Sequence, residues 1–271
     1  MRNSVSVEQI QDGLGRGGKT SNRKVAFTLA EVLITLGIIG VVAAMTLPSL
    51  IQNYQKKALA TQTQKFYSTM SQAVKQYMAD YGVDDLRNTP LASENYVGWN
   101  SPEDIASVRD FVTKYLKVVK ECNPYDEDDN NCFAPVYRLW DNSIPDEGYN
   151  FTTSSIGYGE RDYVLSDGSV IRIFCYSPIG LYVDVNGKKG PNRVGYDLWS
   201  MDIFYDGVID ESGVGPECRG KIDSEYDFDY IKCEQASAQE KREGRFEDCK
   251  AGNPYGGCFG HLLNNNFKFD Y

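Results

Sequence analysis

The stretch FTLAEVLITLGIIGVVAAMTLPSLI, from Phe27 to Ile51, is almost wholly apolar and contains one charged residue, Glu31. A bilayer core takes about 20 helical residues, so this run is long enough to cross a membrane as one helix. Residues 1–26 ahead of it contain five basic and two acidic side chains. A basic segment before an apolar one stays in the cytoplasm and directs the following chain across the membrane. The pattern predicts a cytoplasmic head, one span and an outer domain.

The helical pattern continues beyond Pro48. Apolar residues recur at steps of three and four from Phe66 to Tyr81, which is the period of an amphipathic helix. One helix is therefore predicted over residues 27–81, with Gly82 as its stop. Residues 27–51 would lie in the membrane and the second half would pack on the outer domain. Pro48 removes a backbone hydrogen bond and predicts a kink. A secretory signal peptide shares the basic start and apolar middle, but it explains neither Glu31 nor the continued helical pattern.

The outer domain, residues 82–271, reads as an antiparallel sheet of about four or five strands, so the predicted fold class is α+β. Its clearest signal is the dipeptide Asp167-Gly168 between two alternating runs, which predicts a β-hairpin. Short runs rich in β-branched and aromatic residues are the other strand signals. The predicted strands are Phe133–Trp140, Asp162–Leu165, Val170–Tyr176, Leu181–Val185 and Met201–Tyr205.

All seven cysteines follow the apolar run, where an oxidising compartment permits disulfides. Cys122 and Cys132 bracket one loop that a disulfide could close, and Cys249 and Cys258 bracket another. The sequence leaves the connectivity open. A structural zinc site is the competing interpretation, but no C-x-x-C pair occurs.

Composition argues against two classes of function. A net charge of −10, from 28 basic and 38 acidic residues, is unsuited to a broad nucleic-acid interface. His261 is the only histidine and neither G-x-S-x-G nor H-E-x-x-H occurs, so we predict a protein that is not an enzyme. A nucleotide-loop pattern at Gly13–Thr20 is treated as accidental, because such a loop works between a buried strand and a helix of an α/β sheet, whereas here a membrane helix follows within seven residues.

The segment Lys24–Ile34, KVAFTLAEVLI, resembles the N-terminal cleavage and methylation motif of type IV pilins and type II secretion pseudopilins. The resemblance implies that prepilin peptidase cuts between Ala26 and Phe27 and that Phe27 is then N-methylated. Ala26 stands where the family usually has glycine, and both residues are small. Glu31 becomes the fifth residue of the mature chain, where the family glutamate meets the N-terminal amine of a neighbouring subunit. Pro48 falls where many pilins also have proline.

The same resemblance implies a pilin-like α+β fold with a cleavable leader, residues 1–26. The implied function is that of a structural subunit of a type IV pilus or type II secretion pseudopilus. Its partners would be copies of itself, other pilin-like subunits, prepilin peptidase, the inner-membrane assembly machinery and membrane lipid, with no nucleic acid. The chain would reside in the bacterial inner membrane before assembly. The alternative is a membrane-anchored extracytoplasmic binding domain that never polymerises.

A second segment, beginning Asp184-Val185-Asn186-Gly187 and ending at Asp197, resembles the D-x-N-G...G-P-N...D segment of many pilin-like C-terminal regions. Some pseudopilins bind calcium in a nearby loop. Oxygen atoms of Asp184, Asn186, Asn192 and Asp197 would suit Ca²⁺, so these four are the candidate ligands. A plain turn is the alternative, since Asn-Gly and Gly-Pro are ordinary turn formers.

Overall fold

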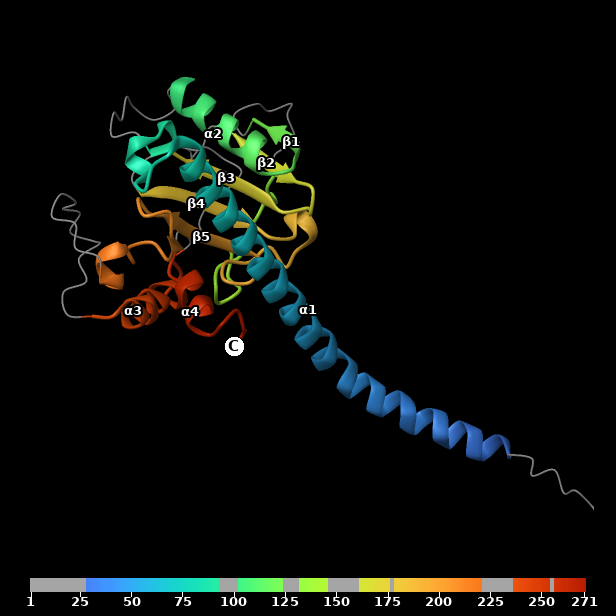
Figure 1. Cartoon of the computed structure of the whole chain (residues 1–271). Coiled ribbons are helices and arrows are strands. Elements are labelled where there is room, and N and C mark those ends of the chain that lie inside the picture. The colour runs from blue at the N-terminus through green and yellow to red at the C-terminus, as the bar shows by residue number, and fades with distance from the viewer. Residues whose placement is uncertain are drawn as a thin grey trace, which may run out of the picture. The chain divides into compact units, whose positions relative to one another are not determined.

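The computed structural model describes residues 28–92, 102–123, 132–145, 161–175, 178–220, 236–253 and 256–271. The chain forms two compact units, Met1–Leu50 and Ile51–Tyr271. The predicted leader and the cleavage site between Ala26 and Phe27 lie outside the described residues. The structure is an α+β fold with one long N-terminal helix and an antiparallel sheet of six strands, as the sequence predicts in outline (Figure 1).

The long helix, α1, runs from Leu29 to Tyr81 over 53 residues, with Pro48 inside it. Its end has a clear cause. Gly82 adopts a left-handed conformation with φ of 67°, which costs glycine little. The N–H of Gly82 donates to the carbonyl oxygen of Ala79 and the N–H of Val83 donates to that of Met78, each at 3.1 Å. This pair of bonds is a Schellman motif, so the predicted stop at Gly82 is confirmed.

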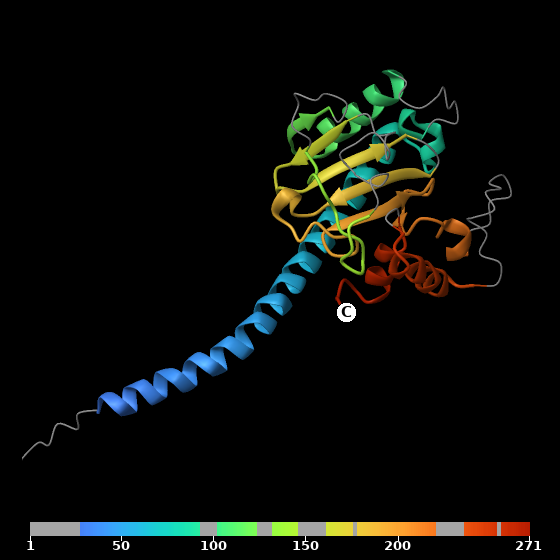
Figure 2. The same cartoon turned by 180° about the vertical axis from the view of Figure 1, so that it is seen from behind.

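Within the second unit, α1 buries one face. The buried positions recur at helical spacing because side chains three and four residues apart share a face. They are Leu59, Ala60, Thr63, Phe66, Met70, Ala73, Val74, Tyr77 and Met78. This face joins the hydrophobic core formed with the sheet. The helix segment crosses in front of the strands in Figure 1 and behind them in Figure 2, so it covers one face of the sheet.

The sheet is a simple meander in which each strand pairs antiparallel with the next. Its strands are β1 Val118–Cys122, β2 Asp162–Leu165, β3 Val170–Phe174, β4 Ile179–Asp184, β5 Leu198–Ile203 and β6 Ile209–Asp210. The predicted hairpin at Asp167-Gly168 joins β2 to β3, and Gly168 has the positive φ that its turn requires, 90°. Every described residue of β3 is buried, which is typical of a central strand.

Two features of the sheet differ from the sequence prediction. The run Phe133–Trp140 is not a strand, since only Arg138 pairs, in an isolated bridge with Arg193. Pro135 lies in this run and has no N–H to donate to a ladder, yet Phe133 and Tyr137 are buried. Apolar residues here fill the core without joining the sheet. Conversely, β1 and β6 are strands that the sequence did not reveal, which raises the number of strands to six.

The described residues form three further α-helices. They are α2 Pro102–Tyr115, α3 Ala238–Lys250 and α4 Cys258–Asn264, and the short 3₁₀ helices are η1 Leu86–Asn88, η2 Pro90–Ala92, η5 Gly187–Lys189 and η6 Pro216–Arg219. Phe111 of α2 meets Tyr77 of α1 edge to face, with ring centroids 5.2 Å apart. Such aromatic pairs add about 0.5–1.5 kcal/mol beyond area burial. Ser237 and Glu240 form a capping box that begins α3.

Candidate functional site

Glu31 lies in the first turn of α1 and caps the helix. Its carboxylate accepts hydrogen bonds from the N–H of Thr28 at 2.8 Å and from the Thr28 hydroxyl at 2.9 Å. In return the Thr28 hydroxyl oxygen accepts from the N–H of Glu31 at 3.2 Å. These reciprocal bonds form a capping box, whose sequence signature is Thr or Ser followed three residues later by Glu or Gln. The sequence prediction assigned Glu31 to subunit docking alone and missed the cap, although T-L-A-E carries the signature.

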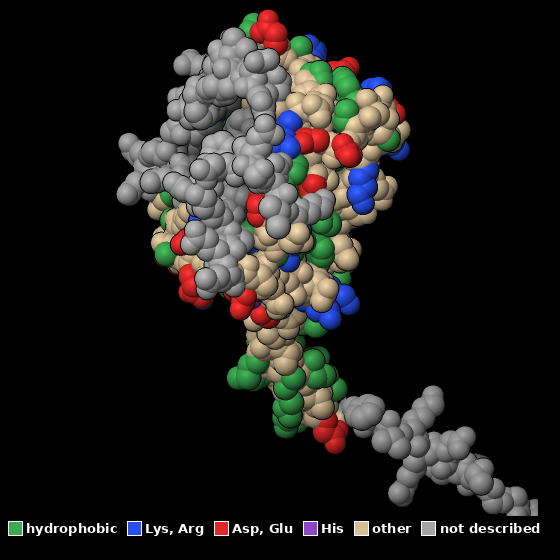
Figure 3. Space-filling model, turned by 60° about the vertical axis from the view of Figure 1, so that its left-hand side comes forward, with side chains coloured by type: hydrophobic (Ala, Val, Ile, Leu, Met, Phe, Trp, Pro, Cys, Tyr) green, Lys and Arg blue, Asp and Glu red, His purple; other side chains and the backbone are tan. Residues whose placement is uncertain are grey.

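The apolar side chains that follow Glu31 are exposed. By length and composition α1 is long and apolar enough to span a membrane, and its most apolar stretch is not buried by the described chain. Leu33, Ile34 and Ile39 are each more than 60% exposed. Hydrophobic side chains dominate this segment in the space-filling view (Figure 3). A continuous exposed apolar surface of this kind requires lipid or other helices to cover it.

The four candidate calcium ligands form one hydrogen-bonded loop after β4. Asp197 accepts from the N–H groups of Asn192 and Arg193, both at 2.7 Å. Asp184 accepts from the N–H of Asn186 at 3.1 Å and from the hydroxyl of Tyr137. Asn186 donates through its amide nitrogen to the carbonyl oxygen of Gly190 at 2.8 Å. The structure therefore brings together the residues that the sequence pattern singled out.

Two buried carboxylates in this loop repel each other. Asp184 and Asp197 have no exposed surface. Burial raises the pKa of Asp184 to about 8, and the charge of Asp197 is the second cause. Burial likewise raises the pKa of Asp197 to about 6. The side-chain oxygen of Asn186 is buried and has no hydrogen-bond partner in the described chain. A divalent cation would offset the repulsion and give this oxygen a ligand, so the loop is compatible with calcium chemistry.

The hydrogen bonds, however, already stabilise the loop as a turn. Both oxygens of Asp197 accept from backbone N–H groups, and Asn192 accepts from the N–H of Gly190 at 3.1 Å. In the described ranges no three His, Cys, Asp or Glu side chains converge as metal ligands do. Calcium binding here stays a prediction, with oxygen atoms of Asp184, Asn186, Asn192 and Asp197 as the candidate ligands.

Calcium added at ten times its dissociation constant is expected to stabilise the folded chain by about 1.4 kcal/mol. For a domain of this size that raises the melting temperature by about 3–5 °C. Differential scanning calorimetry of the full chain in a neutral detergent measures the shift. Asp184→Asn should abolish the response, and Asp141→Asn, at an exposed loop carboxylate, should retain it. An unchanged wild-type melting temperature would show that the loop is only a turn.

Two disulfides close the loops that the cysteine spacing marked. Cys122 is bonded to Cys132 and Cys249 to Cys258. The first ties the end of β1 to the buried run that follows. The second joins the last turn of α3 to the first residue of α4. Each bridge reduces the entropy of the unfolded chain, and the C-terminal helices need such support because they bury few apolar residues of their own.

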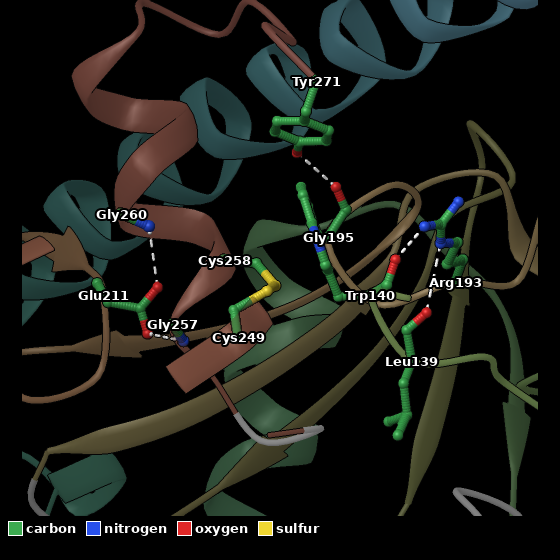
Figure 4. Close-up of a disulfide and its surroundings, with 10 residues drawn as sticks. All are labelled: Leu139, Trp140, Arg193, Gly195, Glu211, Cys249, Gly257, Cys258, Gly260 and Tyr271. Carbon is green, nitrogen blue, oxygen red and sulfur yellow. Dashed lines mark hydrogen bonds between the residues drawn. A yellow bond between two sulfur atoms is a disulfide. The ribbon is translucent and has the colours of Figure 1, made fainter. Parts of the chain in front are cut away.

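Buried acidic residues anchor the same C-terminal helices to the sheet. Glu211, fully buried after β6, accepts hydrogen bonds from the N–H groups of Gly257 at 2.7 Å and Gly260 at 2.9 Å (Figure 4). Gly257 has a φ of 95°, and a Cβ there would lie 2.1 Å from the carbonyl oxygen of Arg245. Only glycine therefore fits at this position. The carboxylate satisfies N–H groups at the start of α4 that the helix itself cannot pair.

Asp210, next to Glu211, is the centre of an ion-pair network. It is fully buried and receives two bonds from Arg242 of α3, at 2.8 and 2.6 Å. Arg219 of η6 donates to it at 3.1 Å and also reaches Asp206 at 3.1 Å. The network joins β6, η6 and α3. Nothing in the sequence marked these residues, because they are scattered among many other charged side chains.

His261 is used for packing and hydrogen bonding. Its ring stacks on that of Phe246, with centroids 3.8 Å apart. One ring nitrogen lies 2.7 Å from a carboxylate oxygen of Glu243, and the other lies 2.9 Å from one of Asp270. These contacts hold α3, α4 and the chain beyond α4 together.

Comparison with known proteins gives one partial match. Residues 49–158 match a family described as a family of unknown function (DUF6613). That match begins near the end of the apolar run and ends before β2. No curated protein and no solved structure matched the chain.

Proposed function

We propose that the chain is a structural subunit of a type IV pilus or type II secretion pseudopilus. Prepilin peptidase would process it between Ala26 and Phe27, and the first half of α1 would then assemble with copies of itself and with other pilin-like subunits. The observation that carries the proposal is Glu31. It is the one charge in an apolar segment that no part of the described chain covers.

A lone carboxylate inside a bilayer is unfavourable unless it is neutralised or paired, so a cation must pair with Glu31 in the filament. Cleavage before Phe27 creates a positively charged amine on each subunit. In a bundle of staggered helices the amine of one chain can pair with Glu31 of the next, and both charges are then compensated. The exposed apolar side chains around Glu31 supply the packing between helices.

Processing is tested by expressing the full chain with and without a prepilin peptidase and measuring its intact mass. We expect the peptidase to produce a chain that begins with N-methylated Phe27. Ala26→Leu should block cleavage, because a bulky side chain does not fit a tight subsite before the scissile bond. Ala30→Leu, the same substitution four residues later, should leave cleavage intact. A chain that retains residues 1–26 beside an active peptidase would rule out the filament function and favour a stand-alone anchored domain.

A further inference from the structure

A cavity of about 730 Å³ lies in the second unit, between the start of its α1 segment and the loop after β4. Its charged lining residues are Lys56, Lys189 and Arg193, and none of its lining residues is acidic. Amide side chains, including those of Gln52 and Gln55, complete the polar wall. Three cations around one cavity are unexpected in a chain of net charge −10.

No acidic side chain in the described ranges neutralises these cations. In the described part of the chain, no Asp or Glu side chain forms an ion pair with Lys56, Lys189 or Arg193. Arg193 donates to the carbonyl oxygens of Leu139, at 3.3 Å, and of Trp140, which are neutral acceptors (Figure 4). Its guanidinium also lies over the ring of Tyr196, 4.1 Å from the centroid. The arginine is thus held in place while its positive charge remains available to a ligand.

Lys56 and Lys189 add two further positive charges to that of Arg193. Lys56 donates to the backbone oxygen of Tyr271. Lys189 is exposed, at the end of η5. A lysine ammonium acts as a point charge toward phosphate, whereas arginine offers a planar fork. The combination suits a tetrahedral anion with several equivalent oxygens.

The cavity lies close to the end of the apolar run. Gln52 is the first residue after Ile51, and Lys56 is the fifth. At 1.5 Å per helical residue, Lys56 lies about 7.5 Å beyond Ile51 along the helix. The polar layer on each side of a bilayer is about 5–8 Å thick, so this level is that of the lipid phosphates.

We propose that the cavity binds a phosphate group, with a phospholipid headgroup as its source. Bound lipid would hold the outer domain against the membrane surface. The proposal requires that the first half of α1 spans a membrane. It does not rest on cleavage or on filament assembly.

The test is native mass spectrometry of the full, uncleaved chain in neutral detergent, titrated with phosphatidylglycerol. Lys189→Gln is the test variant, and Lys188→Gln is its matched control, because Lys188 is the exposed neighbour in η5 and does not line the cavity. One lysine near a lipid surface contributes about 1 kcal/mol, which corresponds to about a five-fold change in affinity. We therefore expect Lys189→Gln to weaken binding about five-fold and Lys188→Gln to bind like the wild type.

Two further titrations identify the source of the phosphate. Diacylglycerol, which has the same acyl chains without phosphate, should bind equally to wild type and Lys189→Gln. If inorganic phosphate competes with phosphatidylglycerol, the anion alone is recognised. If Lys189→Gln weakens lipid binding but inorganic phosphate does not compete, the intact lipid is required. Equal lipid binding by the two variants would overturn the proposal. So would a Lys189→Gln chain that binds lipid normally but self-associates less, since the occupant would then be an acidic segment of a second copy.

Discussion

Replacing Glu31 by glutamine is expected to abolish filament formation while leaving the helix start and the processing of the chain intact. Glutamine serves in a capping box as glutamate does, so it can still accept the hydrogen bond from the N–H of Thr28. It cannot pair with the positive amine of a neighbouring subunit. The loss of one partner from a desolvated charge pair is strongly unfavourable, and this loss recurs at every subunit contact. Filaments are counted by electron microscopy, with the sheared surface fraction blotted for the subunit.

The converse variant separates the two roles of Glu31. Thr28→Ala removes the cap, which costs about 1 kcal/mol of local helix stability, but it retains the carboxylate. We expect this variant to assemble in nearly normal amounts. If Glu31→Gln assembles like the wild type while Thr28→Ala does not, the carboxylate acts as a helix cap and the proposed docking role is wrong.

Replacing Asp210 by alanine is expected to destabilise the outer domain by about 3 kcal/mol, because it removes the fully buried carboxylate that two partly buried arginines share. Arg242 loses both of its bonds to Asp210, and Arg219 loses one of its carboxylate partners. The C-terminal helices should then separate from the sheet at lower denaturant concentrations. Urea unfolding of the full chain in detergent, followed by tryptophan fluorescence, measures the change in midpoint.

The control is Asp248→Ala. Asp248 pairs with Arg245 within α3 at 2.7 Å, but its side chain is 49% exposed. Exposed pairs three or four residues apart on a helix contribute about 0.3–0.5 kcal/mol, so the midpoint should hardly change. Equal decreases of the unfolding midpoint in the two variants would show that the Asp210 network stabilises the fold no more than an exposed ion pair does.

The local signals in the sequence were read correctly where a residue's own chemistry decides its conformation. The period of apolar residues predicted α1, since one helix face must be buried whatever it packs against. Gly82 as a helix stop and Asp167-Gly168 as a hairpin turn depend on backbone geometry within a few residues. The spacing of Cys122 and Cys132 marked a loop that the structure closes.

The sequence prediction was wrong where a partner remote in sequence decides whether a segment becomes a β-strand. The run from Phe133 to Trp140 has strand composition, but it finds no neighbour with which to form a ladder. β1 becomes a strand by pairing with β2, residues 162–165, which are remote in sequence. Strand propensity describes the fit of a side chain to a half-buried surface, and it does not determine which surface is available.

The sequence by itself determined the long helix, its apolar and singly charged first half, and the antiparallel α+β class, because periodicity and turn chemistry act over a few residues. Only the tertiary structure decided the six-strand order, the burial of Asp184 beside Asp197, the Asp210 network and the basic cavity of Lys56, Lys189 and Arg193. These features join residues far apart in the chain. The interactions between their charges become strong only when folding removes water and brings the partners within a few ångströms.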